Sequence, residues 1–474
     1  MINFFLDQHG CAKNQIDAEI IITHLLKKGL KQCENPEDAN IILINSCGFI
    51  ESAKQESLEA VLNAKAAYPN AKILLTGCLA ERYAENFSTE LPEADGIMGN
   101  GNLEIIDSVV DELLQNKRPI EKPEQIGVCC GDRQELLSFP GSAYVKITEG
   151  CDNRCSFCAI PIIRGKLRSR PINEILDEIK SLLKRGIFEI NLVGQDSAAY
   201  GMEGFSPHDP SVWQQFNLEQ DASNEKTKIS PLANLLKEIS KLDGEFWLRI
   251  LYIHPDHFPL DILPIIAQDK RLLPYFDIPF QSGADEIIKS MNRIGNAATY
   301  INLVEKIRKS QKTSYYGSIA LRTTFLTGFP GETNKNAKET EVFLKSISPD
   351  WSGCFNYSKE DDTIAASMKK QIPSKIAKKR SDKLQNIQSE ITALQLQKRV
   401  GNICSVLVEE IIEGGDGEGT GLAIGRAWFQ APEVDGAVVI RYEVEQANLI
   451  IPGKTIQVRL SGTSGVDLTG DLLC

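Results

Sequence analysis

The stretch Ala143-Tyr-Val-Lys-Ile-Thr-Glu-Gly-Cys151-Asp-Asn-Arg-Cys155-Ser-Phe-Cys158 decides the fold class of this chain. It joins an apolar run, typical of a buried strand, to three closely spaced cysteines. Downstream, apolar strand patterns alternate with helical patterns as far as residue 357. Six such strand–helix units predict a partial barrel of parallel strands, with chemistry at the C-terminal strand ends. The six predicted strands are Ala143–Ile147, Glu189–Val193, Phe246–Ile253, Tyr275–Ile278, Ile319–Thr327 and Gly353–Tyr357.

The three cysteines follow the first predicted barrel strand with the spacing CxxxCxxC. Their thiolates can bind three irons of a 4Fe–4S cluster, which leaves the fourth iron open for S-adenosylmethionine (SAM). An electron from such a cluster would cleave SAM to a 5′-deoxyadenosyl radical. A zinc site is the alternative, but it usually needs a fourth Cys or His, and none lies within ten residues on either side. Cys151, Cys155 and Cys158 are therefore predicted to bind a SAM-cleaving cluster.

Upstream, a strand pattern followed by a cysteine occurs three times. The segments FFLDQHGC, IILINSC and ILLTGC end at Cys11, Cys47 and Cys78, and a helical pattern follows each of them. This alternation predicts an open parallel α/β domain over residues 1–114. Because the C-terminal strand ends of such a sheet line one crevice, we expect the three cysteines to converge on one metal ion or cluster. Three separate buried cysteines are the alternative.

The remaining segments complete the domain organisation. Residues 115–140 carry scattered Pro, Gly and charged residues and are predicted to be a linker, and residues 141–373 form the barrel domain. Within the barrel, residues 202–230 are a polar insertion without a period, expected to be disordered or a mobile lid. Residues 374–400 are predicted to be a connecting helix with a solvated basic face. Residues 401–474, with short strand patterns between glycines, predict a small antiparallel β-barrel.

Several polar or glycine residues lie at the ends of predicted barrel strands. Gly194 and Gln195 come directly after the second strand, Arg322 lies within the fifth, and Gly328 begins a Gly-Phe-Pro-Gly-Glu-Thr run after it. Glycine at such a position permits close approach of a ligand to the backbone. We expect these four residues to contact SAM, while tight turns before a capped helix are the alternative for the glycine run. His254 also follows a strand end, where a structural role is favoured over substrate contact.

Composition limits the class of protein. The chain has 474 residues, of which 42% are hydrophobic and 24% charged, with a net charge of −12. These values are typical of a globular protein of several domains, and the acidic balance argues against general affinity for nucleic acids. No apolar run is long enough to span a membrane, and residues 1–7 do not resemble a signal peptide, so a cytoplasmic location is expected. Six of the twelve cysteines belong to neither motif and are predicted to be ordinary: Cys33, Cys129, Cys130, Cys354, Cys404 and Cys474.

Over nearly its full length the sequence resembles the methylthiotransferases of the radical SAM superfamily. The motifs that carry the resemblance are GCAKNQIDAE, INSCGFIESAKQES, LLTGCLAER, CDNRCSFCAIP, RGKLRSRP, LVGQD and RTTFLTGFPGET, in this order. The resemblance implies an N-terminal cluster domain, a radical SAM barrel and a C-terminal TRAM domain. It also implies two 4Fe–4S clusters, an auxiliary one bound by Cys11, Cys47 and Cys78 and a SAM-cleaving one bound by the CxxxCxxC motif.

The reaction that the resemblance implies uses two SAM molecules. One methylates a sulfur at the auxiliary cluster, and the other supplies the radical that abstracts hydrogen from an unactivated carbon. The methylthio group is then transferred to that carbon. A sulfur donor and a small electron donor such as flavodoxin or ferredoxin are the implied partners.

The implied substrate depends on the branch of the family. GCAKN and CGFIESAKQES are similar to the RimO type, which modifies the β-carbon of an aspartate in a small-subunit ribosomal protein, the twelfth. Residues 401–474 hold four Lys or Arg against eleven Asp or Glu, a charge that would attract a basic ribosomal protein and repel tRNA. The expected partner is this protein, free or within an assembled ribosomal subunit. The tRNA-modifying MiaB type is the alternative, and Phe280-Gln281-Ser282-Gly283 is closer to the wording of that type.

Overall fold

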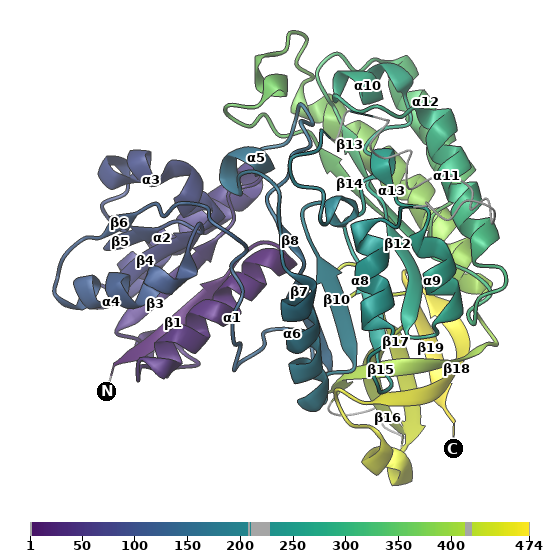
Figure 1. Cartoon of the computed structure of the whole chain (residues 1–474), viewed down its shortest axis with the longest axis horizontal. Coiled ribbons are helices and arrows are strands. Elements are labelled where there is room, and N and C mark those ends of the chain that lie inside the picture. Colours follow the sequence, from purple (N-terminus) through teal and green to yellow (C-terminus); the bar gives the residue numbers. More distant parts are fainter. Residues whose placement is uncertain (1, 207–208, 210–227, 413–419, 474) are drawn as a thin grey trace.

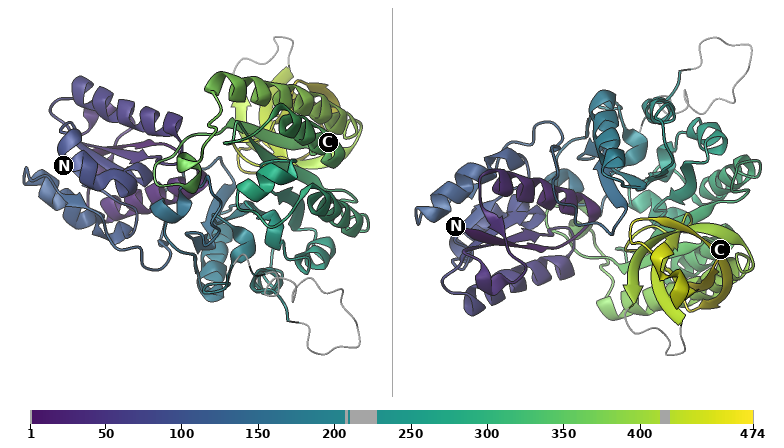
Figure 2. Two further views of the ribbon diagram at one scale, coloured as in Figure 1. Left: turned by 90° about the horizontal axis from the view of Figure 1, so that it is seen from above. Right: turned by 90° about the horizontal axis from the view of Figure 1, so that it is seen from below.

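The computed structural model describes residues 2–206, 209, 228–412 and 420–473. Three parts follow one another along the chain: an N-terminal parallel sheet, a central parallel sheet and a C-terminal closed barrel. In Figures 1 and 2 the N-terminal sheet and the C-terminal barrel lie on different sides of the central sheet. The expected fold class is thereby confirmed.

The N-terminal sheet has six parallel strands in the order β2-β1-β3-β4-β5-β6. Its three cysteine-bearing units each join a strand to a helix: β1 (Asn3–Gln8) to α1 (Ala12–Lys27), β3 (Ile41–Ser46) to α2 (Glu51–Ala67), and β4 (Lys72–Gly77) to α3 (Cys78–Glu90). The other elements are β2 (Lys31–Gln32), β5 (Gly96–Met98), α4 (Ile106–Leu114) and β6 (Ile120–Glu121). Strand β3 is buried along its whole length, as the apolar run of a central parallel strand requires. The edge strand β6 falls within the expected linker.

Helix α1 lies between the N-terminal and central sheets, where it contacts the first central strand, β7 (Ser142–Lys146) (Figure 1). It is therefore buried on its polar side as well as on its apolar side. The helix begins at Ala12, directly after Cys11. Its first turns bring polar side chains into the contact between the two domains.

The central sheet is open and parallel, with the order β14-β13-β12-β11-β10-β7. All six predicted barrel strands are present. Besides β7 they are β10 (Glu189–Val193), β11 (Trp247–Ile250), β12 (Leu272–Asp277), β13 (Ala320–Thr327) and β14 (Trp351–Asn356). Helices with an apolar stripe cover the outside: α6 (Ile172–Lys184), α8 (Pro231–Ile239), α9 (Ile262–Gln268), α10 (Asp285–Ser290), α11 (Ala297–Ser310) and α12 (Asn334–Ile347). Most of the expected insertion, residues 207–208 and 210–227, lies outside the described residues.

Short elements surround the CxxxCxxC motif. Strands β8 (Thr148–Glu149) and β9 (Arg168–Ser169) pair antiparallel, and the segment between them contains the three cysteines and helix α5 (Ile160–Ile163). This pairing closes the cysteine segment into a loop at the C-terminal end of the first barrel strand. Chemistry was expected at this edge of the barrel.

The C-terminal part begins with the predicted connecting helix, α13 (Ser374–Gln397), which packs on β14. The barrel that follows is closed in the order β15-β16-β17-β19-β18. Its strands are β15 (Ile403–Ile412), β16 (Thr420–Ala427), β17 (Val438–Glu443), β18 (Thr455–Ser464) and β19 (Asp467–Leu472). The pair β17–β19 is parallel, which differs from the wholly antiparallel barrel expected from sequence. The tight hairpin makes β19 antiparallel to β18. When the ring of five strands closes, β19 then has the same direction as β17, so these two strands pair in parallel.

A buried ion-pair cluster holds the C-terminal barrel against the central sheet. Glu189 at the start of β10 accepts hydrogen bonds from Arg249 of β11 at 2.9 Å and from Arg426 of β16 at 2.6 Å. Arg249 also donates to the backbone carbonyls of Trp428 and Gln430.

Among the helices in the described ranges, none is both long and apolar enough to cross a membrane.

Candidate functional site

The first three predicted ligands converge at one edge of the N-terminal sheet. Cys11 lies between β1 and α1, Cys47 directly follows β3, and Cys78 begins α3 directly after β4. The three strands are neighbours, so their C-terminal ends are side by side. A Cβ added to Gly10 would lie 3.0 Å from the Cβ of Cys47 and 3.3 Å from its Sγ, which shows how closely the Cys11 turn packs on Cys47.

Two glycines hold the Cys78 turn in place. Gly77 has φ 91° and ψ −155°, a combination that essentially only glycine adopts, and a Cβ there would lie 2.6 Å from the carbonyl oxygen of Ser46. A Cβ on Gly48 would lie 2.7 Å from the carbonyl oxygen of Cys78. The turns that carry Cys47 and Cys78 therefore pack backbone against backbone.

The second set of predicted ligands lies in the loop between β8 and α5. The backbone N–H of Cys158 donates to the carbonyl oxygen of Cys155 at 3.1 Å, and this turn brings the two cysteines together. Asn153 Nδ2 lies 3.4 Å from Cys151 Sγ and donates to Asp196 at 2.7 Å. His254 Nε2 lies 3.8 Å from Cys155 Sγ, so His254 is closer to the predicted site than its sequence context indicated.

Burial is the largest cause of the raised pKa values of these thiols. It raises the pKa of Cys47 and of Cys158 to about 12, and it raises the pKa of Cys78 and of Cys151 as well. Such groups form thiolates when a cation compensates the charge, as cluster irons do. Within the described residues no three His, Cys, Asp or Glu side chains form a site for one metal ion, whereas the cysteines of a cluster each bind a different iron. The donor chemistry of both triads thus fits iron–sulfur clusters.

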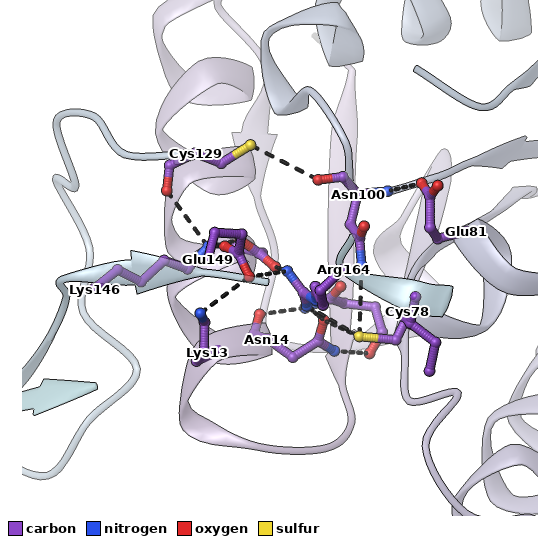
Figure 3. Close-up of polar contacts among 12 residues, drawn as sticks. Lys13, Asn14, Cys78, Glu81, Asn100, Cys129, Lys146, Glu149 and Arg164 are labelled. Atoms are coloured by element: carbon purple, nitrogen blue, oxygen red, sulfur yellow. Dashed lines mark hydrogen bonds and ion pairs between the residues drawn. The ribbon is translucent and has the colours of Figure 1, made fainter. Parts of the chain in front are cut away.

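Arg164 connects the two cysteine-bearing regions (Figure 3). It belongs to the segment that follows the CxxxCxxC motif, and its Nη2 lies 3.0 Å from Cys78 Sγ in the N-terminal domain. Its Nη1 donates to Asp17 of α1 at 2.7 Å. Asn100 Nδ2 also approaches Cys78 Sγ, at 3.6 Å. Cys78 is therefore the cysteine of its triad whose sulfur contacts a cation from the neighbouring domain.

Further buried charges extend this contact (Figure 3). Lys13 Nζ lies 3.0 Å from Glu149 Oε1 and 2.5 Å from Gln195 Oε1, and Gln195 Nε2 donates to Glu149 at 2.9 Å. Lys146 forms ion pairs with Asp17 and, at 3.1 Å, with Glu149. Burial lowers the pKa of Lys13 to about 8 even though Glu149 opposes the change. A paired, buried network of this kind orients the two domains, because loss of one member leaves an uncompensated buried charge.

Three segments of the chain match families of known proteins. Residues 3–99 match the Uncharacterized protein family UPF0004, residues 145–344 the Radical SAM superfamily, and residues 400–473 the TRAM domain. A protein of Treponema denticola named "Ribosomal protein uS12 methylthiotransferase RimO" is 52% identical over 98% of this chain and 99% of its own length. A protein of the same name from Syntrophomonas wolfei is 35% identical over 98% of both chains. The chain belongs to the RimO family.

As a member of this family, the chain is a radical SAM methylthiotransferase with SAM and 4Fe–4S clusters as cofactors. The tRNA-modifying alternative is not favoured, because the relatives reported above carry the ribosomal-protein name. A solved structure, the radical SAM methyltransferase TsrM from Kitasatospora setae, is similar with a TM-score of 0.47 and 12% identity. That similarity covers 74% of this chain and 72% of TsrM.

The four residues expected to contact SAM lie in three different surroundings. Gln195 lies in the contact between the domains, beside Lys13, and Gly194 packs so closely on Thr148 that a Cβ would clash with its hydroxyl. Arg322 is separated from them by strands β11 and β12, and its Nη1 donates to Asp435 of the C-terminal barrel at 2.6 Å. Gly328 packs against Ala377 of α13, where a Cβ would also clash. The structure therefore groups Gln195 with Gly194 and separates both from Arg322.

Sequence reasoning missed the residues that link the triads. Arg164 and Lys13 both lie in motifs that carried the family resemblance, RGKLRSRP and GCAKNQIDAE, but no local pattern assigned them a role. Tyr252 was also missed. It has φ 60°, a strained value for a bulky residue, and its backbone N–H donates to Asp277 at 3.1 Å. Burial raises its pKa, and the Cys11 thiol raises it further.

Three of the cysteines predicted to be ordinary lie in or next to strands. Cys354 is in β14 and Cys404 in β15, and Cys33 donates to the carbonyl oxygen of Phe4. Cys129 lies at the edge of the charge network, with Sγ 3.7 Å from the carbonyl oxygen of Asn100 (Figure 3). Cys474 is outside the described residues.

Proposed function

We propose that this chain attaches a methylthio group to the β-carbon of an aspartate in ribosomal protein uS12. The observation that carries the proposal is the pairing of two cysteine triads, at strand ends of adjacent domains, through the buried Arg164 contact with Cys78. C–H activation needs a radical source, and sulfur transfer needs a second sulfur-bearing site nearby. The name of the 52% identical relative supports uS12 as the substrate.

Each triad is assigned one cluster. Cys11, Cys47 and Cys78 would hold the auxiliary 4Fe–4S cluster, and the CxxxCxxC cysteines would hold the cluster that binds SAM. When bound, these groups supply the sulfur and the electron that cleaves SAM. The protein contributes the surroundings: Arg164 and Asn100 hydrogen-bond the sulfur of Cys78, and Asn153 hydrogen-bonds that of Cys151. Such contacts orient ligands and adjust their charge.

For SAM, the proposed contacts are Gln195, Gly194, Gly328 and Arg322. Gln195 is the best placed, because its side chain bonds to Glu149, two residues before the first cysteine of the motif, and to Lys13, two residues after Cys11. Arg322 would have to exchange its ion pair with Asp435 for a contact with SAM. Replacement of Gln195 should therefore weaken SAM binding more than replacement of Arg322.

The three domains would divide the work as the sequence suggested. Residues 1–114 would carry the sulfur-donating site, residues 141–373 the radical chemistry, and residues 401–474 contact with the substrate, with residues 115–140 and 374–400 as connections. The acidic composition of the last domain favours a basic protein partner. A small electron donor such as flavodoxin or ferredoxin and a sulfur donor complete the proposal. A ribosomal substrate also agrees with the expected cytoplasmic location.

The proposal is tested with reconstituted enzyme, SAM and a chemical reductant. Isolated uS12 should gain one methylthio group, read by mass spectrometry of its peptides, while tRNA should remain unmodified. Modification of tRNA alone would overturn the proposed substrate.

The cluster assignments need a separate measurement. Wild-type protein should contain about eight irons, and the Cys11→Ala/Cys47→Ala/Cys78→Ala variant about four. This variant should still cleave SAM, whereas Cys155→Ala should not. About four irons in both proteins would show that the N-terminal cysteines are not cluster ligands.

A further inference from the structure

A strongly basic segment stands out on this acidic chain. Residues 369–383 contain seven Lys or Arg against one acid, Asp382, although the whole chain has a net charge of −12. All six lysines of the segment are exposed. We call them the basic rim: Lys369, Lys370, Lys375, Lys378, Lys379 and Lys383.

The basic rim borders the mouth of the central barrel. The carbonyl oxygen of Lys370 accepts a hydrogen bond from Gly331, in the loop after β13, at 2.9 Å. The backbone N–H of Ala365, shortly before the rim, donates at 2.8 Å to the carbonyl oxygen of Ser156 in the CxxxCxxC loop. Phe157 of that loop packs in the same apolar cluster as Met368. In Figure 1, α13 begins beside β13 and β14. The segment that carries Lys369 and Lys370 therefore lies next to the CxxxCxxC loop, and the other four lysines follow along the first turns of α13.

Only two of the six lysines form an ion pair in the described part of the chain. Lys378 pairs with Asp382 and Lys383 with Glu341, but Lys369, Lys370, Lys375 and Lys379 have no carboxylate within ion-pair distance in the described part of the chain. The first turn of α13 contains no acid, so Lys375 faces the positive end of the helix dipole. Such an arrangement destabilises the helix slightly. A bound anion would compensate this cost.

We propose that the basic rim binds phosphates of the ribosomal RNA around uS12, so that the enzyme recognises the assembled small subunit. This inference rests on the proposed function. A ribosomal protein within its subunit is surrounded by RNA, which would repel a uniformly acidic enzyme. Exposed lysines act as point charges that bind phosphates without reading sequence, and they lie at the edge that must approach the target. The acidic C-terminal barrel and the basic rim thus suit the two components of one substrate.

The test compares two substrates and two variants of the reconstituted enzyme. The rim variant changes Lys369, Lys370, Lys375 and Lys379 to Gln. The control variant changes four exposed lysines outside the rim, Lys31, Lys117, Lys309 and Lys312, to Gln, with the same loss of charge. Binding to assembled small subunits is measured against salt concentration, and methylthio transfer is measured separately on isolated uS12 and on subunits.

The rim variant should bind subunits at least about tenfold more weakly than the control at low salt. Its slope of log affinity against log salt should be smaller by about 3, as expected for four lost phosphate contacts. Both variants should modify isolated uS12 equally. Equal subunit binding by the two variants would overturn the inference. If wild type transferred no methylthio group to either isolated uS12 or subunits, that would contradict the proposed function instead, and the binding comparison would still decide the role of the rim. Equally strong competition by bulk tRNA would show general polyanion affinity and would also contradict a subunit-specific role.

Discussion

At the scale of single residues, Arg164 has the most consequential position. Its guanidinium is almost fully buried and contacts Asp17, Cys78 and, at 3.5 Å, Glu149. One cation therefore contacts two carboxylates and a sulfur from two domains, beside the ion pairs that Lys146 and Lys13 make with the same carboxylates. A hydrogen bond to a ligating sulfur stabilises the more negative, reduced state of a cluster, so the same contact affects both folding and redox chemistry.

Replacement of Arg164 should separate these two effects. Arg164→Ala should lower the free energy of unfolding by about 3–5 kcal/mol, because the buried ion pair of Arg164 with Asp17 is broken, and Arg164→Lys should lower it less. In protein that also carries Ala at all three CxxxCxxC positions, Arg164→Lys should shift the midpoint potential of the remaining cluster to a more negative value. Urea unfolding and potentiometric titration followed by electron paramagnetic resonance measure the two quantities. An unchanged potential would show that Arg164 acts only in domain docking.

At the scale of elements, the strand–turn–helix unit is what places each N-terminal cysteine. The turn after β4 is the tightest, since Gly77 adopts backbone angles closed to other residues and lies against Ser46. Helix α3 begins at the next residue, so any shift of the turn moves Cys78 and its contact with Arg164. The glycine is therefore required for ligand position as well as for folding.

Gly77→Ala should destabilise the protein by about 2–3 kcal/mol or more, since strained backbone alone costs about 1–3 kcal/mol and the clash adds to it. Iron content should fall toward about four per chain as Cys78 is displaced. Gly29→Ala is the matched control: Gly29 has φ 92°, but a Cβ there would meet nothing within 4 Å. Thermal unfolding measures the stability of both variants, and iron analysis measures their cluster content. Equal effects of the two changes would mean that backbone strain alone, without contact, explains the loss.

At the scale of the whole molecule, the C-terminal barrel is held to the central sheet by charge. Although burial opposes it, Arg426 and Arg249 lower the pKa of Glu189 from 4.5 to about 2. Glu409 also pairs with Arg426, and burial raises its pKa. Because the carboxyl of Glu189 is more acidic in the folded state, its contribution is complete above pH 4.5 and is lost as pH falls toward 2.

Acid should therefore weaken this docking in a defined window. Wild-type apoprotein should lose about 3 kcal/mol more of its unfolding free energy between pH 5 and pH 2 than Glu189→Gln, in which this titration is absent. The measurement is urea unfolding followed by the fluorescence of the four tryptophans, among them Trp428, whose carbonyl binds Arg249. Parallel pH profiles for the two proteins would rule out Glu189 as the titrating group.

The sequence alone determined the strand–cysteine units, the parallel partial barrel and the small β-barrel. These features follow from local patterns: apolar runs of strand length, turns with glycine, and short cysteine spacing, which act between neighbours in the chain. Convergence of Cys11, Cys47 and Cys78 was also predictable, because adjacent parallel strands must end at the same edge.

Only the tertiary structure decided how the domains meet. The contact of Arg164 with Cys78 joins residues 86 positions apart, and the ion pair of Arg322 with Asp435 joins residues 113 positions apart. Neither has a periodic or local signal, since each depends on the docking of one completed domain on another. The basic rim begins next to the CxxxCxxC loop for a similar reason, since that contact joins segments far apart in the chain. The parallel β17–β19 pair instead follows from closure of the barrel within one domain. A side chain finds a distant partner only after the intervening elements have packed.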